Sequence, residues 1–278
     1  MGSMYGLLAL GFYVTYSVSQ TVNFSQGSSM MLGAVLTHTF AVILGWDMAL
    51  SIVLALLLCA AWGVLVERIA VRPFAQNGSN TWLMSTVAIG IILENIVLFT
   101  FGKEPRNLPS PLALNTIDIG GFGVYPQQLL VPVVTLLIAT TLFLLTRRTK
   151  HGRAMLAIVQ NRRAASLMGI NVRIAIIIAY AVSTVFAGVA GILIAPLFAV
   201  SAGMGTLFGI KAFAVAILGG MSSIHGVILA GLCYGIGEAM ITAYFGSSYT
   251  QIFTFALVIL VLLVRPHGLF GWAGVKKV

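Results

Sequence analysis

The chain has 278 residues, of which 59% are hydrophobic and only 8% are charged, against roughly 25% charged residues in a typical soluble domain. So few charges cannot cover a water-soluble globule of this length, which excludes a soluble enzyme and indicates a protein that spans the membrane several times. The formal net charge of +9 would suggest nucleic acid as the partner of a soluble protein. In a membrane protein, basic loops kept in the cytoplasm explain the charge, so we expect the lipid bilayer and no nucleic acid.

Long apolar stretches predict the membrane-spanning helices, each of which needs about 20 apolar residues. Lipid permits only helices or closed barrels, and these stretches lack the alternation of barrel strands. The sequence therefore predicts an all-α polytopic membrane protein with a single transmembrane domain over residues 1–278. The expected spans are approximately 4–22, 28–45, 48–66, 81–101, 127–146, 174–196, 207–222, 224–244 and 248–264. They give about eight or nine transmembrane or re-entrant helices, because the weakest span, 207–222, either crosses the bilayer or re-enters it.

The charges of the loops predict the orientation of the chain. Residues 147–173 carry seven Lys and Arg and no acidic residue, which places this loop in the cytoplasm. Arg265, Lys276 and Lys277 place the C-terminus on the same side. The loop 102–126, whose formal charges cancel, then lies outside, and nine spans put the N-terminus outside as well.

The basic loop also predicts a short helix. Asn161 is a favourable N-cap residue and Gly169 a favourable residue just after a helix end. The residues between them have basic side chains at Arg162 and Arg163 and apolar ones at Ala164, Ala165, Leu167 and Met168. A capped helix with exposed Leu and Met is a docking device for another protein. The alternative is a solvated basic loop that only fixes the topology.

A polar segment, Asn23 to Ser29, separates the first two apolar stretches. A break in a helix is tolerated inside the bilayer only where the freed backbone faces protein or a watery cavity, and such breaks line the sites of transporters. The candidate path residues are Asn23, Ser25, Gln26, Gly27 and Ser28. The alternative is an ordinary turn at the membrane surface.

Three charged residues fall within predicted spans, where charged groups are costly and commonly functional. Lys211 and Glu238 lie on neighbouring spans, and we expect a structural ion pair rather than a proton relay. Glu94 either faces a cavity or extends toward Lys103. The same residues leave two other functions open. One is an ion-coupled transporter or channel, and the other is a membrane-embedded enzyme with one of them as acid or base. The chain has no metal-ligand spacing and no GxxxxGK[ST] phosphate loop, so we expect no bound metal and no ATP hydrolysis by this chain alone.

The motifs, taken together, resemble the permease subunits of branched-chain amino acid (Liv-type) ABC transporters. The resemblance covers nearly the whole chain in the right order. The matching segments are NFSQG at 23–27, MLGA at 31–34, ERIAVRP at 67–73, FGKEPR at 101–106, GRAM at 152–155, QNRRAASLMGIN at 160–171, FAGVAG at 186–191, ILGGM at 217–221 and RPHGLFG at 265–271. The segment 67–73 is expected to form a turn.

The resemblance implies a bacterial inner-membrane permease subunit of an ATP-driven importer for branched-chain amino acids. Gln26 stands where the family has a histidine, so another small solute (an amide, urea or an aromatic acid) stays an alternative. The implied ATPase-coupling residues are Arg153, Asn161, Arg162, Arg163, Ala165, Leu167, Met168 and Gly169.

The implied assembly has a second homologous permease, two cytoplasmic ATPase subunits and an external substrate-binding protein that meets the 102–126 loop. The permease itself would be no enzyme. It would hold no cofactor, with ATP and Mg on the ATPase subunits.

Overall fold

The structure is a computed structural model that describes residues 1–75, 80–119, 122–221, 223–265 and 268–270. Its α-helices are α1 (Gly2–Ser19), α2 (Gln26–His38), α3 (Met48–Val66), α4 (Arg72–Ala75), α5 (Trp82–Phe101), α6 (Pro126–Arg148), α7 (Lys150–Gln160), α8 (Arg162–Leu167), α9 (Val172–Ile194), α10 (Met204–Gly219), α11 (Ile224–Phe245) and α12 (Thr250–Val264). The π-helical segments η1 (Thr39–Ile43) and η2 (Glu67–Val71) and the 3₁₀ turns η3 (Pro111–Ala113) and η4 (Ser247–Tyr249) accompany them. In the described part of the chain, the only strands are β1 (Ile117–Ile119) and β2 (Phe122–Val124), which pair antiparallel.

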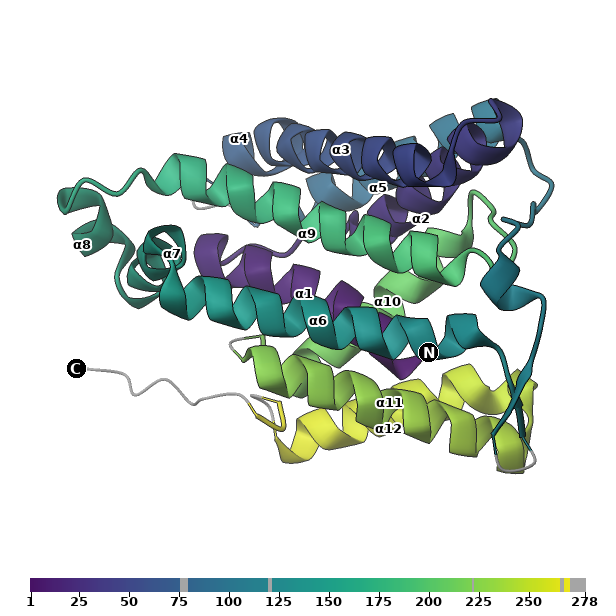
Figure 1. Ribbon diagram of the computed structural model, residues 1–278. Coiled ribbons are helices and arrows are strands. Elements are labelled where there is room, and N and C mark those ends of the chain that lie inside the picture. Colours follow the sequence, from purple (N-terminus) through teal and green to yellow (C-terminus); the bar gives the residue numbers. More distant parts are fainter. Residues whose placement is uncertain (76–79, 120–121, 222, 266–267, 271–278) are drawn as a thin grey trace.

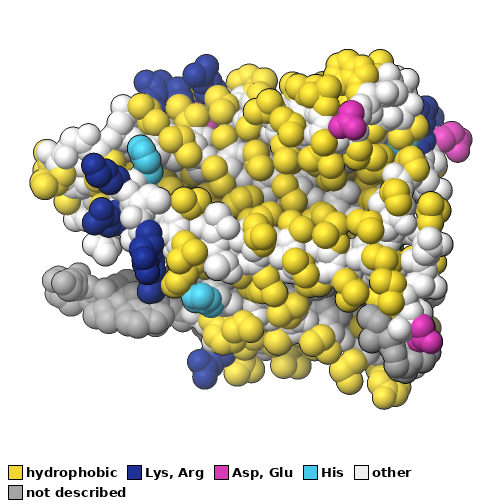
Figure 2. All heavy atoms as spheres, in the orientation of Figure 1, with side chains coloured by type: hydrophobic (Ala, Val, Ile, Leu, Met, Phe, Trp, Pro, Cys, Tyr) yellow, Lys and Arg dark blue, Asp and Glu magenta, His cyan; other side chains and the backbone are white. Residues whose placement is uncertain are grey.

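The long helices form one bundle with two distinct ends (Figure 1). α7 and α8 lie at one end, where α12 also finishes, and the hairpin β1–β2 lies at the other end with the N-terminus. Figure 2 shows an apolar surface between the two ends, with most of the visible Lys and Arg side chains toward the end of the bundle that carries α7 and α8. This arrangement fits a bundle surrounded by lipid, with its charges at the two water interfaces.

The expected all-α polytopic fold is confirmed, and each expected span corresponds to a helix. Six helical stretches in the described residues are long and apolar enough to cross a membrane: Met48–Ala75, Trp82–Phe101, Pro126–Arg148, Val172–Ile194, Ile224–Phe245 and Ser247–Val264. The remaining three helices, α1, α2 and α10, have 18, 13 and 16 residues. α10 is a continuous helix without a reversal, about 24 Å long at 1.5 Å per residue.

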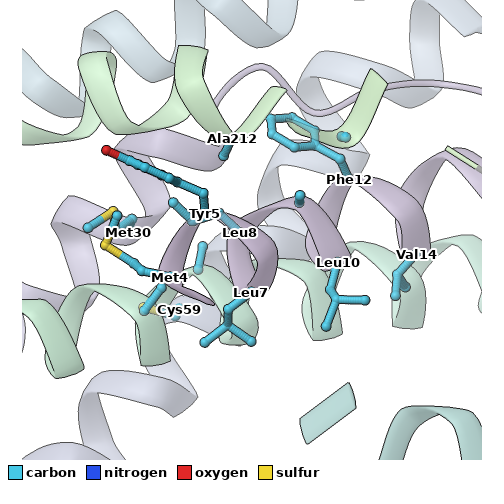
Figure 3. Close-up of a cluster of buried hydrophobic side chains, with 14 of the residues drawn as sticks. Met4, Tyr5, Leu7, Leu8, Leu10, Phe12, Val14, Met30, Cys59 and Ala212 are labelled. Carbon is cyan, nitrogen blue, oxygen red and sulfur yellow. The ribbon is translucent and has the colours of Figure 1, made fainter. Parts of the chain in front are cut away.

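The centre of the bundle is formed by α1 and α9, which pack against α2, α3, α10 and α11. Figure 3 shows buried side chains of α1 in one hydrophobic cluster with Met30 of α2, Cys59 of α3 and Ala212 of α10. The outer helices instead expose large apolar side chains, such as Phe99 of α5 (86% exposed) and Leu263 of α12 (81%). These exposures are expected where lipid, rather than water, is the solvent.

One local expectation needs correction, and two loops contain elements that were not predicted. The turn predicted at 67–73 is wrong, because the helix continues from α3 through η2 into α4. In η2 the Arg72 N–H donates to the Glu67 carbonyl, and the two side chains pair, so the i, i+5 spacing suits a π-helical turn. The 102–126 loop contains a β-hairpin, and the 147–173 loop contains α7 as well as the expected short helix.

Candidate functional site

The segment between α1 and α2 is non-helical and lies inside the bundle. α1 ends at Ser19, and Gln20 takes a left-handed conformation with φ 58°. The next helix starts at Gln26, whose side chain meets Ser183 in the middle of α9 and Gly11 in the middle of α1. The chain therefore returns from the end of α1 to the middle of the bundle before α2 begins, which excludes an ordinary surface turn.

Gln26 is held in a closed cluster of hydrogen bonds. Its Nε2 donates to the Ser183 carbonyl at 2.9 Å, and Ser183 Oγ lies 2.9 Å from both Gln26 Oε1 and the Gly11 carbonyl oxygen. Asn23 Oδ1 accepts bonds from the backbone N–H (3.1 Å) and the Oγ (2.7 Å) of Ser25. Gln26, Asn23 and Ser25 have no exposed surface. The Nδ2 of Asn23 has no hydrogen-bond partner among the described residues.

The first turn of α2, which carries Gln26 on one side, lines a cavity of about 270 Å³ on its other side. Gly27 and Ser28 contribute from α2, Glu94 from α5 and Thr206 from α10, with Phe24 beside them. Glu94 Oε1 accepts bonds from Ser28 Oγ at 3.2 Å and from Thr206 Oγ1 at 2.8 Å. Of the five candidate path residues, Gly27 and Ser28 thus line this cavity, and Asn23, Ser25 and Gln26 do not.

Glycines allow α2 and α10 to cross next to the cavity. A Cβ added at Gly27 would overlap the carbonyl oxygen of Gly205, and one at Gly205 would overlap the carbonyl oxygen of Gly27. Such close approach of backbones is typical of helix crossings built on small residues in membranes. The crossing brings the first turn of α10, with Thr206, to the start of α2.

Lys211 of α10 and Glu238 of α11 form the expected ion pair. The two side chains are 12% and 13% exposed, and Lys211 Nζ also lies 3.4 Å from the hydroxyl of Tyr5. Each charge is therefore compensated within the bundle. Glu94 takes the first of its two expected alternatives, since it faces a cavity.

A larger basin of about 920 Å³ opens at the end of the bundle that carries α8. Arg162 and Arg163 of α8 line one side, and Gln20 and Thr21 of the non-helical segment line the other. Thr21 Oγ1 is in turn bonded to the Tyr180 hydroxyl of α9 at 2.8 Å. The basin thus lies between the basic loop and the broken segment.

The short helix predicted in the basic loop is confirmed as α8. Asn161 Oδ1 accepts bonds from the backbone N–H groups of Arg163 (3.1 Å) and Ala164 (3.0 Å), and Gly169 follows the helix with φ +84°. Leu167 and Met168 are 85% and 83% exposed. Of the other candidate coupling residues, Arg153, Arg162 and Arg163 are exposed, and Ala165 is buried beneath the helix.

Two features of these sites were not predicted from the sequence. Thr206 lies just outside the expected span 207–222, and only the crossing of α2 and α10 brings it to Glu94. The basin is lined by several segments that are distant in the sequence, so it has no local sequence signal. Among the described residues, no group of three or more His, Cys, Asp or Glu could hold a metal ion.

Comparison with known proteins identifies the family. The model of the family described as branched-chain amino acid transport system / permease component matches residues 1–262. The chain belongs to this family. It is 33% identical over 291 residues to the high-affinity branched-chain amino acid transport system permease protein BraD of Pseudomonas aeruginosa, covering 100% of this chain and 95% of that protein. The permease is also 33% identical to LivH of Escherichia coli, covering 100% of this chain and 94% of LivH.

More distant similarities extend the comparison. The permease is 27% identical over 293 residues to LivM of Escherichia coli, covering 96% of this chain and 67% of LivM. The solved structure "PsaBC from Streptococcus pneumoniae in complex with Fab" aligns with a TM-score of 0.51 at 13% identity, over 96% of this chain and 90% of that one. This last likeness concerns the fold alone. The chain is thus a multi-pass membrane protein and a translocation subunit.

Proposed function

We propose that this permease is the transmembrane subunit of an ATP-driven importer for branched-chain amino acids in the bacterial inner membrane. It works with a second homologous permease, two cytoplasmic ATPase subunits and an external substrate-binding protein. ATP and Mg are bound by the ATPase subunits, and this chain holds no cofactor. The proposal is supported by BraD and LivH, branched-chain amino acid permeases to which this chain is similar over its full length.

One observation of the structure carries the mechanism: α8 is a capped helix that presents Leu167 and Met168 to the outside of the bundle. Exposed apolar side chains of this size, at the end of the molecule where Lys and Arg gather, are suited to a groove of a cytoplasmic protein. We assign this end to the cytoplasm, and the hairpin end with the N-terminus to the periplasm. Lys276 and Lys277, which also predict a cytoplasmic C-terminus, lie outside the described residues.

A shift of α8 can be transmitted to the solute path through few residues. When the ATPase subunits close, they shift α8, whose Arg162 and Arg163 face Gln20 and Thr21 across the basin. The segment that follows Thr21 leads directly to Gly27 and Ser28 at the cavity. Coupling then requires that α8 makes different contacts in the outward-open and inward-open states, because only such a difference shifts their populations.

The test is uptake by the reconstituted complex. Proteoliposomes with both permeases, the ATPases and the binding protein should accumulate L-leucine when ATP is supplied on the ATPase side, and an uncoupler should not prevent it. The same complex without Mg-ATP is the control. Uptake that persists without ATP and collapses with an uncoupler would instead establish the ion-coupled alternative.

A further inference from the structure

We propose that the Glu94 carboxylate binds the ammonium group of the solute in the cavity between α2, α5 and α10. The inference rests on the proposed transport function and names the residue that selects for an amino acid. It concerns a site other than the closed cluster of Gln26.

The charge of Glu94 has no counter-ion in the cavity. The two groups bonded to its Oε1 are the neutral hydroxyls of Ser28 and Thr206, and its Oε2 accepts no hydrogen bond from a described residue. The described residues that line the cavity include no Lys, Arg or His. Glu238, by contrast, is paired with Lys211. Of Glu67, Glu94 and Glu238, the acidic residues of the long helices, only Glu94 lacks a cationic partner among the described residues and needs a cation from elsewhere.

An uncompensated carboxylate cannot face acyl chains, because a charged side chain in the membrane interior is costly and turns to protein or water. Thr206, Ile91 and Ile210 are exposed at the rim of the cavity, so the cavity opens sideways on the bundle. We therefore place the second permease over this face, with the solute passing between the two subunits beside Glu94.

The rest of the cavity suits the aliphatic part of a branched-chain amino acid. Phe12, Phe24 and Phe213 line it together with Val87. Its volume of about 270 Å³ is close to the lower end of the range for small-molecule sites, about 300 Å³. Glu94 is the one charged group among the described lining residues, so it orients the solute by its ammonium end.

The first experiment compares Glu94→Gln with wild type in the reconstituted complex, using L-leucine as the probe. The amide keeps the shape and the bonds to Ser28 and Thr206 but carries no charge. We expect leucine uptake to fall about tenfold, which corresponds to about 1.4 kcal/mol of lost interaction. ATP hydrolysis stimulated by the binding protein should stay within about twofold of wild type, since α8 and the outer loop are untouched.

Two variants serve as controls. Glu94→Asp keeps the charge and should restore part of the uptake. Asn95→Ala changes the adjacent residue of α5, whose amide bonds only the Ile91 carbonyl of its own helix at 2.8 Å, and it should leave uptake unchanged. Normal uptake by Glu94→Gln would overturn the inference, and so would an equal loss of uptake and ATP hydrolysis, because a purely structural residue behaves in that way.

A second experiment does not depend on transport. Thr206→Lys places an ammonium group beside Glu94, and Thr206→Met places a side chain of similar length without charge. If Glu94 lacks a counter-ion, the purified Lys variant should unfold at a higher temperature than the Met variant. Equal unfolding temperatures, or a lower one for the Lys variant, would contradict the inference.

The Glu94→Gln variant separates this inference from the proposed function. ATP-dependent leucine uptake that is the same in wild type and in Glu94→Gln would overturn the role of Glu94 and leave the proposed function in place. Failure to take up any solute with ATP would overturn the proposed function, and the role of Glu94 with it.

Discussion

The first turn of α2 carries two polar clusters that differ in what they leave unsatisfied. On one side, the amide of Gln26 and the hydroxyl of Ser183 satisfy each other in a site without exposed surface. On the other side, Ser28 and Thr206 bind a carboxylate whose charge has no partner in an open cavity. A closed cluster stabilises the fold, and an open one is available to a solute. Polarity at membrane depth alone does not distinguish them.

The ion pair of Lys211 and Glu238 compensates its own charges, although Glu238 Oε2 accepts no hydrogen bond from a described residue, and it should show the largest effect on stability. Lys211→Met leaves Glu238 without its partner, which costs about 3–5 kcal/mol for a buried pair. The double variant with Glu238→Met should lose less than either single variant. The free energy of unfolding, measured by SDS titration in mixed micelles, tests this, and additive losses in the double variant would show that the two residues are not coupled.

Ser183→Ala should show the next largest effect. It leaves Gln26 Oε1 without a buried donor, which costs about 1–3 kcal/mol, while the Gly11 carbonyl keeps the Thr15 hydroxyl as a donor at 3.2 Å. The matched variant Ser28→Ala should cost only about 0.5 kcal/mol, since water in the cavity can replace the hydroxyl. The same SDS titration compares the two. Equal losses would mean that the two clusters do not differ in the way proposed.

Cysteine labelling tests which side of the turn meets the solute path, with only a small effect on stability. In a background without Cys59 and Cys233, Ser28→Cys should react with a small polar thiol reagent, and its rate should change when ATP is trapped on the ATPases. Gln26→Cys should react at least about tenfold more slowly, since reaction requires the buried site to open at a cost of about 1.4 kcal/mol or more. Fast labelling of the Gln26→Cys variant would show that Gln26, and with it Asn23, lines the solute path.

Leu167→Asp should have the smallest effect on the stability of the permease. Its side chain is 85% exposed, and such surface substitutions change the free energy of unfolding by about 0.5 kcal/mol or less. Co-purification of the ATPase and coupled hydrolysis should nevertheless be lost, because the charge replaces an apolar docking contact. Gln160→Asp, at the exposed end of α7, is the matched control. Normal assembly by the Leu167 variant would show that α8 is not the contact.

The sequence by itself determined the local structure of this protein. Long uncharged stretches allow only helices in lipid, and the caps Asn161 and Gly169 place α8 because both act within a few residues of the helix end. The expected pairing of Lys211 with Glu238 also followed, since a buried charge requires a partner. The turn at 67–73 was misjudged, because Glu67 and Arg72 reach each other only in a π-helical segment that charge spacing does not reveal.

Only the tertiary structure decided the depth of each polar residue and the side that it faces. Gln26 and Ser28 are two positions apart, yet one meets α9 and the other meets α5 and α10. That division depends on the crossing of α2 and α10 at Gly27 and Gly205, whose residues are nearly 180 positions apart in the chain. A local pattern cannot specify which distant helices meet. Packing of small residues sets how close the backbones come, and thereby where a cavity remains.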